Sequence, residues 1–186
     1  MAFLCRNASL EITGAMTYYT YFESPIEPLL LTADGELLTG LYLSAHRCKP
    51  DGTDWQRNDD ASVFAETKAQ LNAYFDGKLT EFNLPLLMHG TQFQKQVWEE
   101  LKKIPYGSTI SYKELAQRVG NPKGARAVGL ANKHNPISII VPCHRAIAVS
   151  GKLTGYSGGL VCKAALLELE SSTIKRLPVP YHQIFV

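Results

Sequence analysis

Residues 111–133 read SYKELAQRVGNPKGARAVGLANK. Ser111, with Glu114 three positions later, predicts a capping box at the start of a short helix that ends at the next glycine. Asn121-Pro122 then offers a cap and a preformed first turn for a second helix over 123–133. Two short helices joined by a glycine-bearing turn predict a helix-turn-helix.

The second of these helices is slim on one side. Ala127 and Gly129 carry little or no side chain, and glycine inside a helix costs about 0.5 to 1 kcal/mol relative to alanine. Close approach to a partner backbone would explain this cost, and so would close helix packing inside the domain. Arg126, with Lys123 and Lys133 near the helix ends, indicates contact with nucleic acid, the alternative being that these cations are simply solvated.

Charge is divided unevenly along the chain. Residues 1–90 hold 6 Lys and Arg against 12 Asp and Glu, whereas residues 91–186 hold 13 against 5, although the formal net charge is only +2. Phosphate neutralisation supplies most non-specific affinity for nucleic acids, so the basic half indicates a polyanionic partner. The alternative is that the basic side chains only solvate a surface.

A thiol and an imidazole stand side by side in the run 141–145, Val-Pro-Cys-His-Arg, directly after the β-branched segment 137–141. A thiol at its free pKa of about 8.5 is only slightly ionised near neutrality, so a nucleophilic cysteine needs a basic or cationic neighbour. For Cys143, His144 is the candidate base and Arg145 adds positive charge. The alternative is a small buried cysteine at a strand end beside a surface histidine.

The remaining elements follow from periodicity and turn signals. The predicted antiparallel strands lie within 18–22 and 28–42, the predicted surface loop is 47–60, the predicted helix is 61–75, and the predicted linker is 84–89. Gly77 is a natural stop for that helix. The apolar residues at helical spacing, predicted to face the core, are Phe64, Leu71, Tyr74 and Phe75. Thr91 with Gln94 predicts one more capped helix.

Nothing in the sequence predicts export, a membrane span or a bound cofactor. No run of about 18 apolar residues occurs, and residues 1–16 lack the clean apolar core of a signal peptide. Four cysteines without CxxC spacing predict reduced thiols in the cytoplasm, namely Cys5, Cys48, Cys143 and Cys162. Cys162 is a rival nucleophile near a helix start, or else a small packed side chain.

Several further motifs surround the Cys-His pair. In chain order they are Gly90-Thr91-Gln92-Phe93-Gln94, Ser111-Tyr112, Gly124-Ala125-Arg126-Ala127-Val128-Gly129, Asn135-Pro136, Gly155-Tyr156-Ser157-Gly158-Gly159, and Lys163 to Glu170. Together with 141–145, they resemble the O6-alkylguanine-DNA alkyltransferase (methylated-DNA protein-cysteine methyltransferase) family. The resemblance is dense over 90–170 and loose over 18–87.

The resemblance implies a two-domain α/β protein. An N-terminal α/β, ribonuclease H-like domain would span 18–87, and a C-terminal helix-turn-helix, winged-helix-like domain carrying the reactive cysteine would span 89–172. The implied function is one-use repair of O6-alkylguanine in double-stranded DNA by irreversible transfer of the alkyl group to cysteine. We expect a monomer that acts either alone or cooperatively on DNA, with no membrane partner, in the cytoplasm or nucleoid of a bacterium or the nucleus of a eukaryote.

The resemblance also implies roles for four residues in the chemistry. Cys143 would be the nucleophile, His144 would take its proton through a bridging water, and Glu170 would hydrogen-bond the imidazole and stabilise its cation. Asn135 would brace the water and the turn.

Other residues would bind the substrate. Tyr112 would donate to the guanine ring nitrogen, Ser157 would contact the guanine oxygen, and Tyr156 would pack on the base. Arg126 would fill the stack vacated by the extruded base. Ala146 stands where the family usually has valine, which predicts a wider alkyl pocket. Some family members bind zinc, but the possible ligands here do not match and we expect no metal; they are Cys5, His46, Cys48 and His89.

Two other functions remain open on sequence alone. A non-catalytic lesion-binding or regulatory helix-turn-helix protein could share the fold, but such a protein needs no nucleophile. A cysteine hydrolase could use Cys143 and His144, but that function leaves the helix-turn-helix unexplained.

Overall fold

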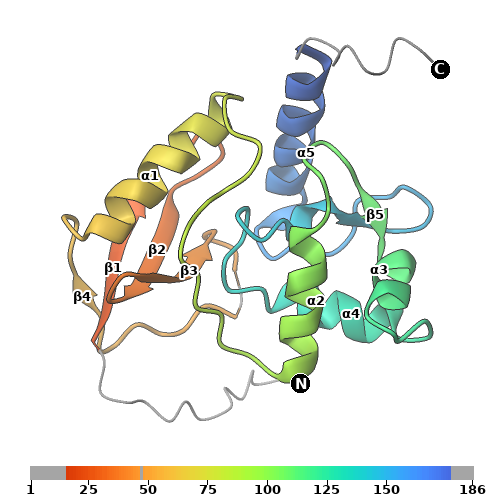
Figure 1. The fold of residues 1–186 in the computed structure, drawn as a ribbon, viewed down its shortest axis with the longest axis horizontal. Coiled ribbons are helices and arrows are strands. Elements are labelled where there is room, and N and C mark those ends of the chain that lie inside the picture. Colours follow the sequence, from red (N-terminus) through yellow and green to blue (C-terminus); the bar gives the residue numbers. More distant parts are fainter. Residues whose placement is uncertain (1–15, 47, 177–186) are drawn as a thin grey trace.

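The computed structural model describes residues 16–46 and 48–176 (Figure 1). A sheet with one helix forms the N-terminal part, and a mainly helical part follows it. The predicted two-domain α/β class is therefore confirmed. Among the described residues, no helix is long and apolar enough to cross a membrane.

The N-terminal domain is a four-stranded sheet, in the order β3-β2-β1-β4, with α1 packed against it (Figure 1). Its elements are β1 (Thr17–Phe22), β2 (Leu29–Asp34), β3 (Leu37–Tyr42), β4 (Gln56–Arg57) and α1 (Ser62–Phe75). Strands β1, β2 and β3 pair antiparallel, as predicted, from Thr17 opposite Asp34 onward. The short β4 pairs parallel with β1, so the stretch 47–60 is not entirely loop. A strand of two residues is too short to show alternation.

Helix α1 ends where the sequence predicts. Gly77 has φ +71°, its N–H donates to the carbonyl of Tyr74, and the N–H of Lys78 donates to that of Ala73. This is the Schellman arrangement, in which a glycine in the left-handed region closes the helix. Tyr74 is fully buried on the inner face of α1.

The C-terminal domain contains the predicted helix-turn-helix. Its elements are α2 (Gln92–Lys102), β5 (Ile110–Ser111), α3 (Tyr112–Arg118), α4 (Ala125–Lys133), a 3-10 turn η1 (Cys143–Arg145), β6 (Ala146–Ile147) and α5 (Gly159–Arg176). Thr91 forms both hydrogen bonds of the predicted capping box with Gln94. The Ser111 hydroxyl caps α3 by accepting from the Glu114 N–H.

The second helix of the motif begins two residues later than predicted. The N–H of Gly124 donates to the carbonyl of Asn121 and closes a turn, so α4 starts at Ala125 with Gly124 as its cap. The asparagine therefore closes the turn between the helices instead of capping α4.

The β-branched segment before the reactive pair is a buried turn and not the end of a strand. Only Ile137 makes a β-bridge, to Leu41 of β3, and Ile139 has φ +70°. Asn135 closes the turn, because its side-chain amide donates to the carbonyl of Val141 and its side-chain oxygen accepts from the N–H of Ile137. The apolar run signals burial, which by itself does not distinguish a strand from other buried backbone.

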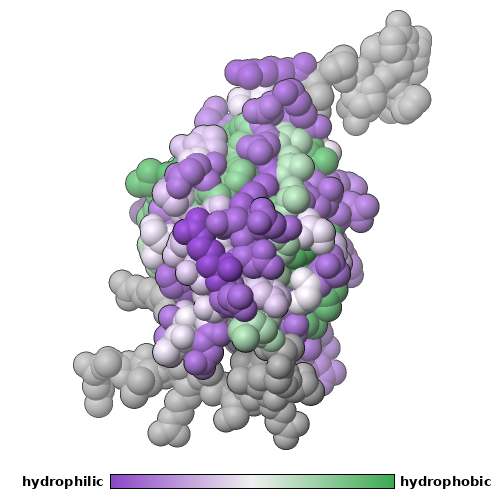
Figure 2. All heavy atoms as spheres, turned by 90° about the vertical axis from the view of Figure 1, so that its left-hand side faces the viewer, coloured by the Kyte–Doolittle hydropathy of each residue, from purple (hydrophilic) through white to green (hydrophobic). Residues whose placement is uncertain are grey.

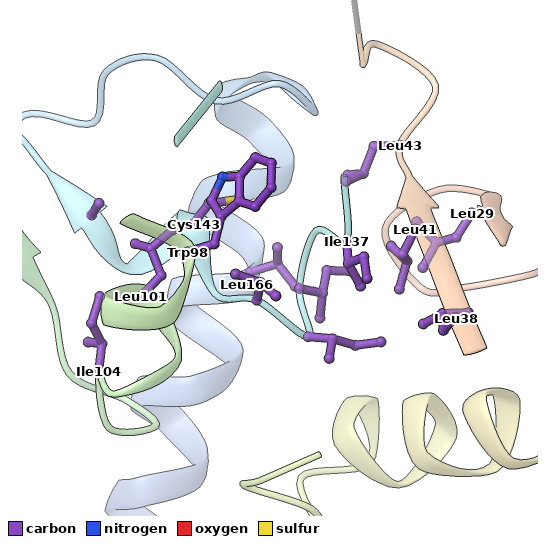
Figure 3. Packing of buried hydrophobic residues seen from close by; sticks show 14 of the residues in the cluster. Leu29, Leu38, Leu41, Leu43, Trp98, Leu101, Ile104, Ile137, Cys143 and Leu166 are labelled. Atoms are coloured by element: carbon purple, nitrogen blue, oxygen red, sulfur yellow. The ribbon is translucent and has the colours of Figure 1, made fainter. Parts of the chain in front are cut away.

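One continuous apolar core joins the two domains. It runs from Leu29, Leu38 and Leu41 of the sheet through Ile137 to Leu166 of α5 (Figure 3). Backbone hydrogen bonds add to this contact, since the edge strand β3 pairs through Leu38 with 85–87 of the linker and through Leu41 with 136–138 of the buried turn. The edge strand of the sheet thus fixes where the buried turn that leads to Cys143 begins.

The outer face of the N-terminal domain is polar. Figure 2 shows hydrophilic side chains across the centre of the face that lies on the left of Figure 1. Exposed ion pairs of the N-terminal domain include Arg57 with Asp59 and Lys78 with Asp76.

The end of α1 provides a test of the contact between domains. A Cβ at Gly77 would lie 2.8 Å from Oγ1 of Thr173 in α5, whereas a Cβ at Gly120, with φ +73°, would meet nothing within 4 Å. Gly120→Ala should therefore cost only the left-handed backbone penalty of about 1 to 2 kcal/mol. Gly77→Ala should cost about 1 to 3 kcal/mol more, the usual range for overpacking. Urea denaturation measures both losses, and equal losses would contradict a tight contact here.

Candidate active site

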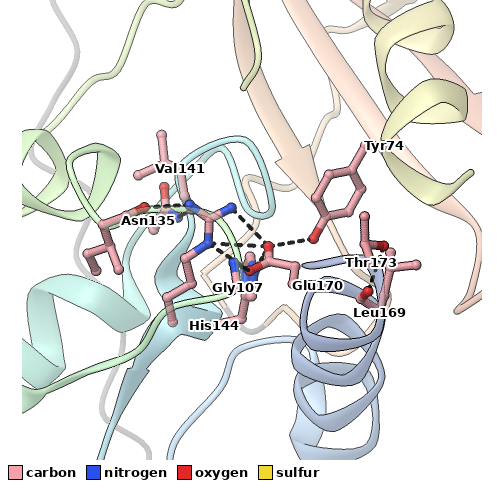
Figure 4. Close-up of polar contacts among 10 residues, drawn as sticks. Tyr74, Gly107, Asn135, Val141, His144, Leu169, Glu170 and Thr173 are labelled. Atoms are coloured by element: carbon pink, nitrogen blue, oxygen red, sulfur yellow. Dashed lines mark hydrogen bonds and ion pairs between the residues drawn. The ribbon is translucent and has the colours of Figure 1, made fainter. Parts of the chain in front are cut away.

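A buried carboxylate, Glu170 of α5, lies at the centre of the polar network between the domains (Figure 4). Its Oε1 accepts hydrogen bonds from Tyr74 Oη at 2.8 Å, His144 Nε2 at 2.8 Å and Arg145 Nη2 at 2.9 Å. Its Oε2 accepts from Arg145 Nε at 3.0 Å and from the Gly107 N–H at 3.0 Å. The four partners come from three separate parts of the chain.

The network keeps Glu170 ionised. Burial alone would raise the pKa of this carboxyl, but hydrogen bonds and charges from His144 and Arg145 outweigh it and lower the pKa to about 2. Arg145 supplies the compensating charge, and its Nη1 also donates to the Ile104 carbonyl at 2.6 Å. Glu170 can therefore orient and stabilise a cation, but it does not accept a proton near neutral pH.

His144 has the features of a general base. Burial lowers its pKa more than Glu170 raises it, so the imidazole is neutral near pH 7. In the tautomer that donates from Nε2 to Glu170, the other ring nitrogen, Nδ1, is an acceptor. That Nδ1 is buried and has no hydrogen-bond partner among the residues that the structure describes. The imidazole therefore has one unused site for a proton.

Cys143 begins η1 and is only 2% exposed. Burial raises the pKa of its thiol, although hydrogen bonds from Asn135 and Ser138 and the charge of Lys163 act in the opposite direction. The thiol is therefore protonated at rest, and attack by sulfur requires that a base take its proton.

The cation near this thiol is Lys163 and not the neighbouring Arg145, which turns toward Glu170. Lys163 is fully buried, and its Nζ donates to the carbonyls of Ala146 at 2.7 Å and Thr154 at 3.0 Å. Burial lowers its pKa to about 8, so it is mostly charged at pH 7. The expectation that Arg145 provides the charge beside sulfur is therefore wrong, because its guanidinium donates to the Glu170 carboxylate and to the Ile104 carbonyl instead.

A cleft of about 550 Å³ lies between the helix-turn-helix and loop 154–159. Its lining residues are Ala45, Tyr112, Gly129, Lys133, Thr154, Gly155, Tyr156, Ser157 and Gly159. The Tyr112 hydroxyl donates to the Gly155 carbonyl at 3.1 Å, and Ser157 Oγ donates to the Lys133 carbonyl at 2.7 Å. Loop 154–159 is thus held against the helix-turn-helix, and both contacts close the cleft on that side.

Two tyrosines that line the cleft, Tyr112 and Tyr156, are also close enough to Cys143 to respond to its charge. Burial raises the pKa of Tyr112 to about 12 and that of Tyr156 well above its usual value, and a charge on Cys143 is the second cause for each. The hydroxyl of Tyr156 is buried without a hydrogen-bond partner in the described part of the chain. The cleft, the two phenols and the sulfur are therefore neighbours.

Ala146 lies away from the cleft surface. It is fully buried in the apolar core, pairs with Ile110 between β5 and β6, and does not line the cleft. Its predicted influence on the size of the alkyl pocket stays a prediction.

The outward side of α4 carries the predicted DNA-contacting residues. Arg126, Ala127 and Lys133 are exposed, as is Lys123 just before the helix. A Cβ at Gly129 would meet nothing within 4 Å, so packing inside the domain does not require glycine there. The helix is slim toward the cleft and the solvent.

The other candidate thiol and the possible metal ligands form no second site. Burial and the nearby Glu27 raise the pKa of Cys162, which makes it a poor nucleophile. No group of three or more His, Cys, Asp or Glu is placed to hold a metal ion within 16–46 and 48–176. Cys5 lies outside the described residues.

Two family models match the chain. The 6-O-methylguanine DNA methyltransferase ribonuclease-like domain matches residues 17–88, and the DNA binding domain of the same family matches residues 92–172. The chain belongs to the 6-O-methylguanine DNA methyltransferase family. The resemblance found in the sequence is thereby confirmed.

Individual members of the family are similar over most of their length. The methylated-DNA--protein-cysteine methyltransferase of Mycobacterium tuberculosis is 54% identical over 157 residues, which cover 84% of this chain and 94% of that protein. The one from Methanosarcina acetivorans is 52% identical, with coverages of 83% and 99%. The crystal structure of Mycobacterium tuberculosis OGT in complex with DNA has a TM-score of 0.79, at 52% identity and coverages of 84% and 94%.

The sequence did not predict two side chains that lie at the candidate active site, Lys163 and Tyr74. Lys163 gave a signal that could have been used, because it is a lone cation among apolar residues near the start of a helix. Tyr74 was predicted only as a core aromatic. Its burial agrees with that prediction, but no local pattern tells that its hydroxyl reaches Glu170 in the other domain.

The carboxylate network predicts a large loss of stability when Glu170 is neutralised. Glu170→Gln leaves the buried Arg145 guanidinium without a counter-charge and should lower the free energy of unfolding by about 3 to 5 kcal/mol. Glu168→Gln, on the exposed side of the same helix, is the control and should stay within about 0.5 kcal/mol of wild type. Similar values for both variants in urea denaturation would contradict the central role of the network.

The same pair of proteins tests the pKa of Glu170. Because the pKa in the folded state lies near 2, below its ordinary value of 4.5, the stabilisation by the carboxylate is complete above about pH 4.5. It is lost as the pH falls toward 2. The difference in unfolding free energy between wild type and Glu170→Gln should therefore shrink over this range. A difference that does not change with pH would show that Glu170 is not the group that titrates.

Proposed function

We propose that the protein repairs O6-alkylguanine in duplex DNA by moving the alkyl group to Sγ of Cys143. Transfer to a protein cysteine is the activity of its family, and this chain is a DNA-repair methyltransferase of that kind. The observation that supports Cys143 as the acceptor is its position next to a neutral histidine whose buried Nδ1 has no hydrogen-bond partner within 16–46 and 48–176. The thioether is stable, so each molecule reacts once.

The reaction is a displacement at the alkyl carbon. The thiol proton passes to Nδ1 of His144 through a bridging water, sulfur forms a bond to the carbon, and the bond from carbon to the guanine oxygen breaks. Tyr112 donates toward the guanine ring nitrogen and stabilises the leaving anion. No cofactor is needed, because the protein supplies the nucleophile and the base.

Transfer of the proton changes the charges of His144 and Cys143, and each new charge has a neighbour of opposite sign. When His144 becomes an imidazolium, Glu170 at 2.8 Å stabilises it and remains ionised. The thiolate left behind has the buried Lys163 as the neighbouring cation. Asn135 holds the turn that presents the sulfur, through its hydrogen bonds to Ile137 and Val141.

The extruded base enters the cleft beside the thiol. Chemistry on a paired base requires that the nucleotide swing out of the stack, and Tyr156 and Ser157 line the cleft that would receive it. The Tyr112 hydroxyl, which donates to the Gly155 carbonyl in the free protein, exchanges this acceptor for the guanine nitrogen. Binding of the base therefore loosens loop 154–159.

The exposed side of α4 is the DNA-reading surface. Arg126 fills the space left by the extruded base, Lys123 and Lys133 contact phosphates, and Ala127 and Gly129 allow the DNA backbone to come close. DNA as partner is supported by the DNA binding domain of the family and by the DNA complex of the Mycobacterium tuberculosis relative. Domain limits at 18–87 and 89–172, action as a monomer, cooperation along DNA and location in cytoplasm, nucleoid or nucleus stay predictions.

The first prediction of this function concerns the acceptor. Cys143→Ala should abolish transfer from an O6-methylguanine duplex and retain DNA binding, because the phosphate contacts lie on α4. Wild type should gain the mass of one methyl group, and peptide mapping should find it on residue 143. A methyl group mapped to Cys162 would overturn the assignment.

The second prediction concerns base extrusion. Arg126→Ala should slow the reaction with duplex DNA much more than the reaction with free O6-benzylguanine, because only the duplex requires the base to leave the stack. Lys123→Ala is the matched comparison: it removes a proposed phosphate contact, so it should weaken DNA binding but leave the rate at saturating duplex near that of wild type, whereas Arg126→Ala should slow the reaction even at saturating duplex. Equal losses by Arg126→Ala on both substrates would mean that this residue does not act in extrusion.

A further inference from the structure

A corner of the N-terminal domain reaches the active site. This corner, residues 43–46, follows β3 directly. Ala45 lines the same cleft as Tyr112 and Tyr156, although they belong to the other domain. The cleft therefore has one wall that the C-terminal domain does not provide.

The corner is also bonded to the reactive turn. His46 is 5% exposed, and its Nε2 lies 3.1 Å from the backbone carbonyl oxygen of Asn135. The side chain of Asn135 in turn holds the carbonyl of Val141, two residues before Cys143. A continuous path of hydrogen bonds and backbone thus links the end of β3 to the sulfur.

His46 is a neutral hydrogen-bond donor. Burial lowers its pKa, the hydrogen bond to the Asn135 carbonyl opposes that effect, and the charges of His134 and Lys49 lower the pKa further. Tyr42 also packs edge-on against the ring, at 5.2 Å between centroids. A neutral imidazole facing a carbonyl at Nε2 must carry its proton there, so His46 donates and Asn135 accepts.

Two more contacts hold the corner in place. The Glu27 carboxylate accepts from the Ser44 N–H at 2.7 Å and from the Ser44 hydroxyl at 2.8 Å. Leu43 packs so closely on Gly158 that a Cβ on this glycine would lie 2.4 Å from the leucine side chain. The corner is therefore fixed against the cleft loop as well as against the reactive turn.

We propose that the corner 43–46 forms one wall of the substrate pocket. Ala45 sets the room available to the alkyl group, and His46 positions the turn that carries Cys143. The proposal rests on the proposed function of the cleft. It gives the N-terminal domain a part in substrate selection, whereas the nucleophile, the base and the DNA-reading helix all lie in the C-terminal domain.

The first test narrows the pocket. Ala45→Leu adds bulk at an exposed position, so folding should be unaffected, and the ratio of O6-benzylguanine transfer to O6-methylguanine transfer should fall about 10-fold or more. Ala65→Leu makes the same change at an exposed position of α1 and should leave the ratio unchanged. An unchanged ratio for Ala45→Leu, with normal methyl transfer, would contradict the proposal that Ala45 forms a wall of the alkyl pocket.

The second test breaks the hydrogen bond to the turn. His46→Leu removes the donor and should slow transfer about 10-fold or more from both substrates, because a small displacement of the nucleophile is costly. His46→Gln keeps an amide donor and should restore most of the rate. A purely structural role predicts that the rate follows the unfolding free energy of each variant. If the Leu and Gln variants had equal rates, the positioning role would be wrong.

The wild type and Ala65→Leu separate this proposal from the function on which it rests. If neither gained a methyl group from an O6-methylguanine duplex, the proposed function itself would fail. If both reacted normally and only the Ala45 and His46 predictions failed, the cleft would still be the active site but the corner would not be part of it.

Discussion

The structure depends on one buried carboxylate. A charge removed from water is tolerated only when it is paired and hydrogen-bonded. Glu170 meets this condition through α1, the loop after α2 and η1, so its partners hold together segments that lie far apart in the sequence. The domain interface and the proposed proton-handling site therefore share the two carboxylate oxygens of Glu170. Rearranging either one would leave an unpaired charge in the apolar core.

The sulfur of Cys143, the proposed nucleophile, shows the opposite arrangement, since it is buried without a charge of its own. Burial keeps the Cys143 thiol protonated and shields it from solvent, while the charge of Lys163 lowers the pKa of the thiol and His144 is the proposed base. A molecule that reacts only once gains from this arrangement, because a permanently ionised and exposed thiol would be lost to oxidation before it met a lesion.

Hydrogen bonds connect α4, the proposed DNA-reading helix, to Cys143, the proposed nucleophile. At the end of α4, Asn132 donates to the Cys143 carbonyl at 3.3 Å, and the Trp98 indole donates to the Ala131 carbonyl at 2.9 Å. The helix proposed to hold the DNA is thus tied to the backbone of the residue proposed to attack it. On the other side, β3 and the corner 43–46 fix the same turn from the N-terminal domain. The reactive turn is held from both domains, which suits a reaction that depends on the position of a single sulfur atom.

The sequence by itself determined the features that arise from neighbouring residues. Caps and stops such as Thr91 and Gly77, the helix-turn-helix and the adjacent thiol and imidazole of Cys143 and His144 all depend on local backbone and spacing. Tertiary structure decided which groups meet across the domains: Arg145 turns to Glu170 instead of the thiol, Tyr74 brings its hydroxyl to that carboxylate, and the segment 137–141 forms a turn because β3 pairs with its start. These outcomes balance burial, charge and hydrogen bonds among residues distant in the chain, and no local pattern contains that balance.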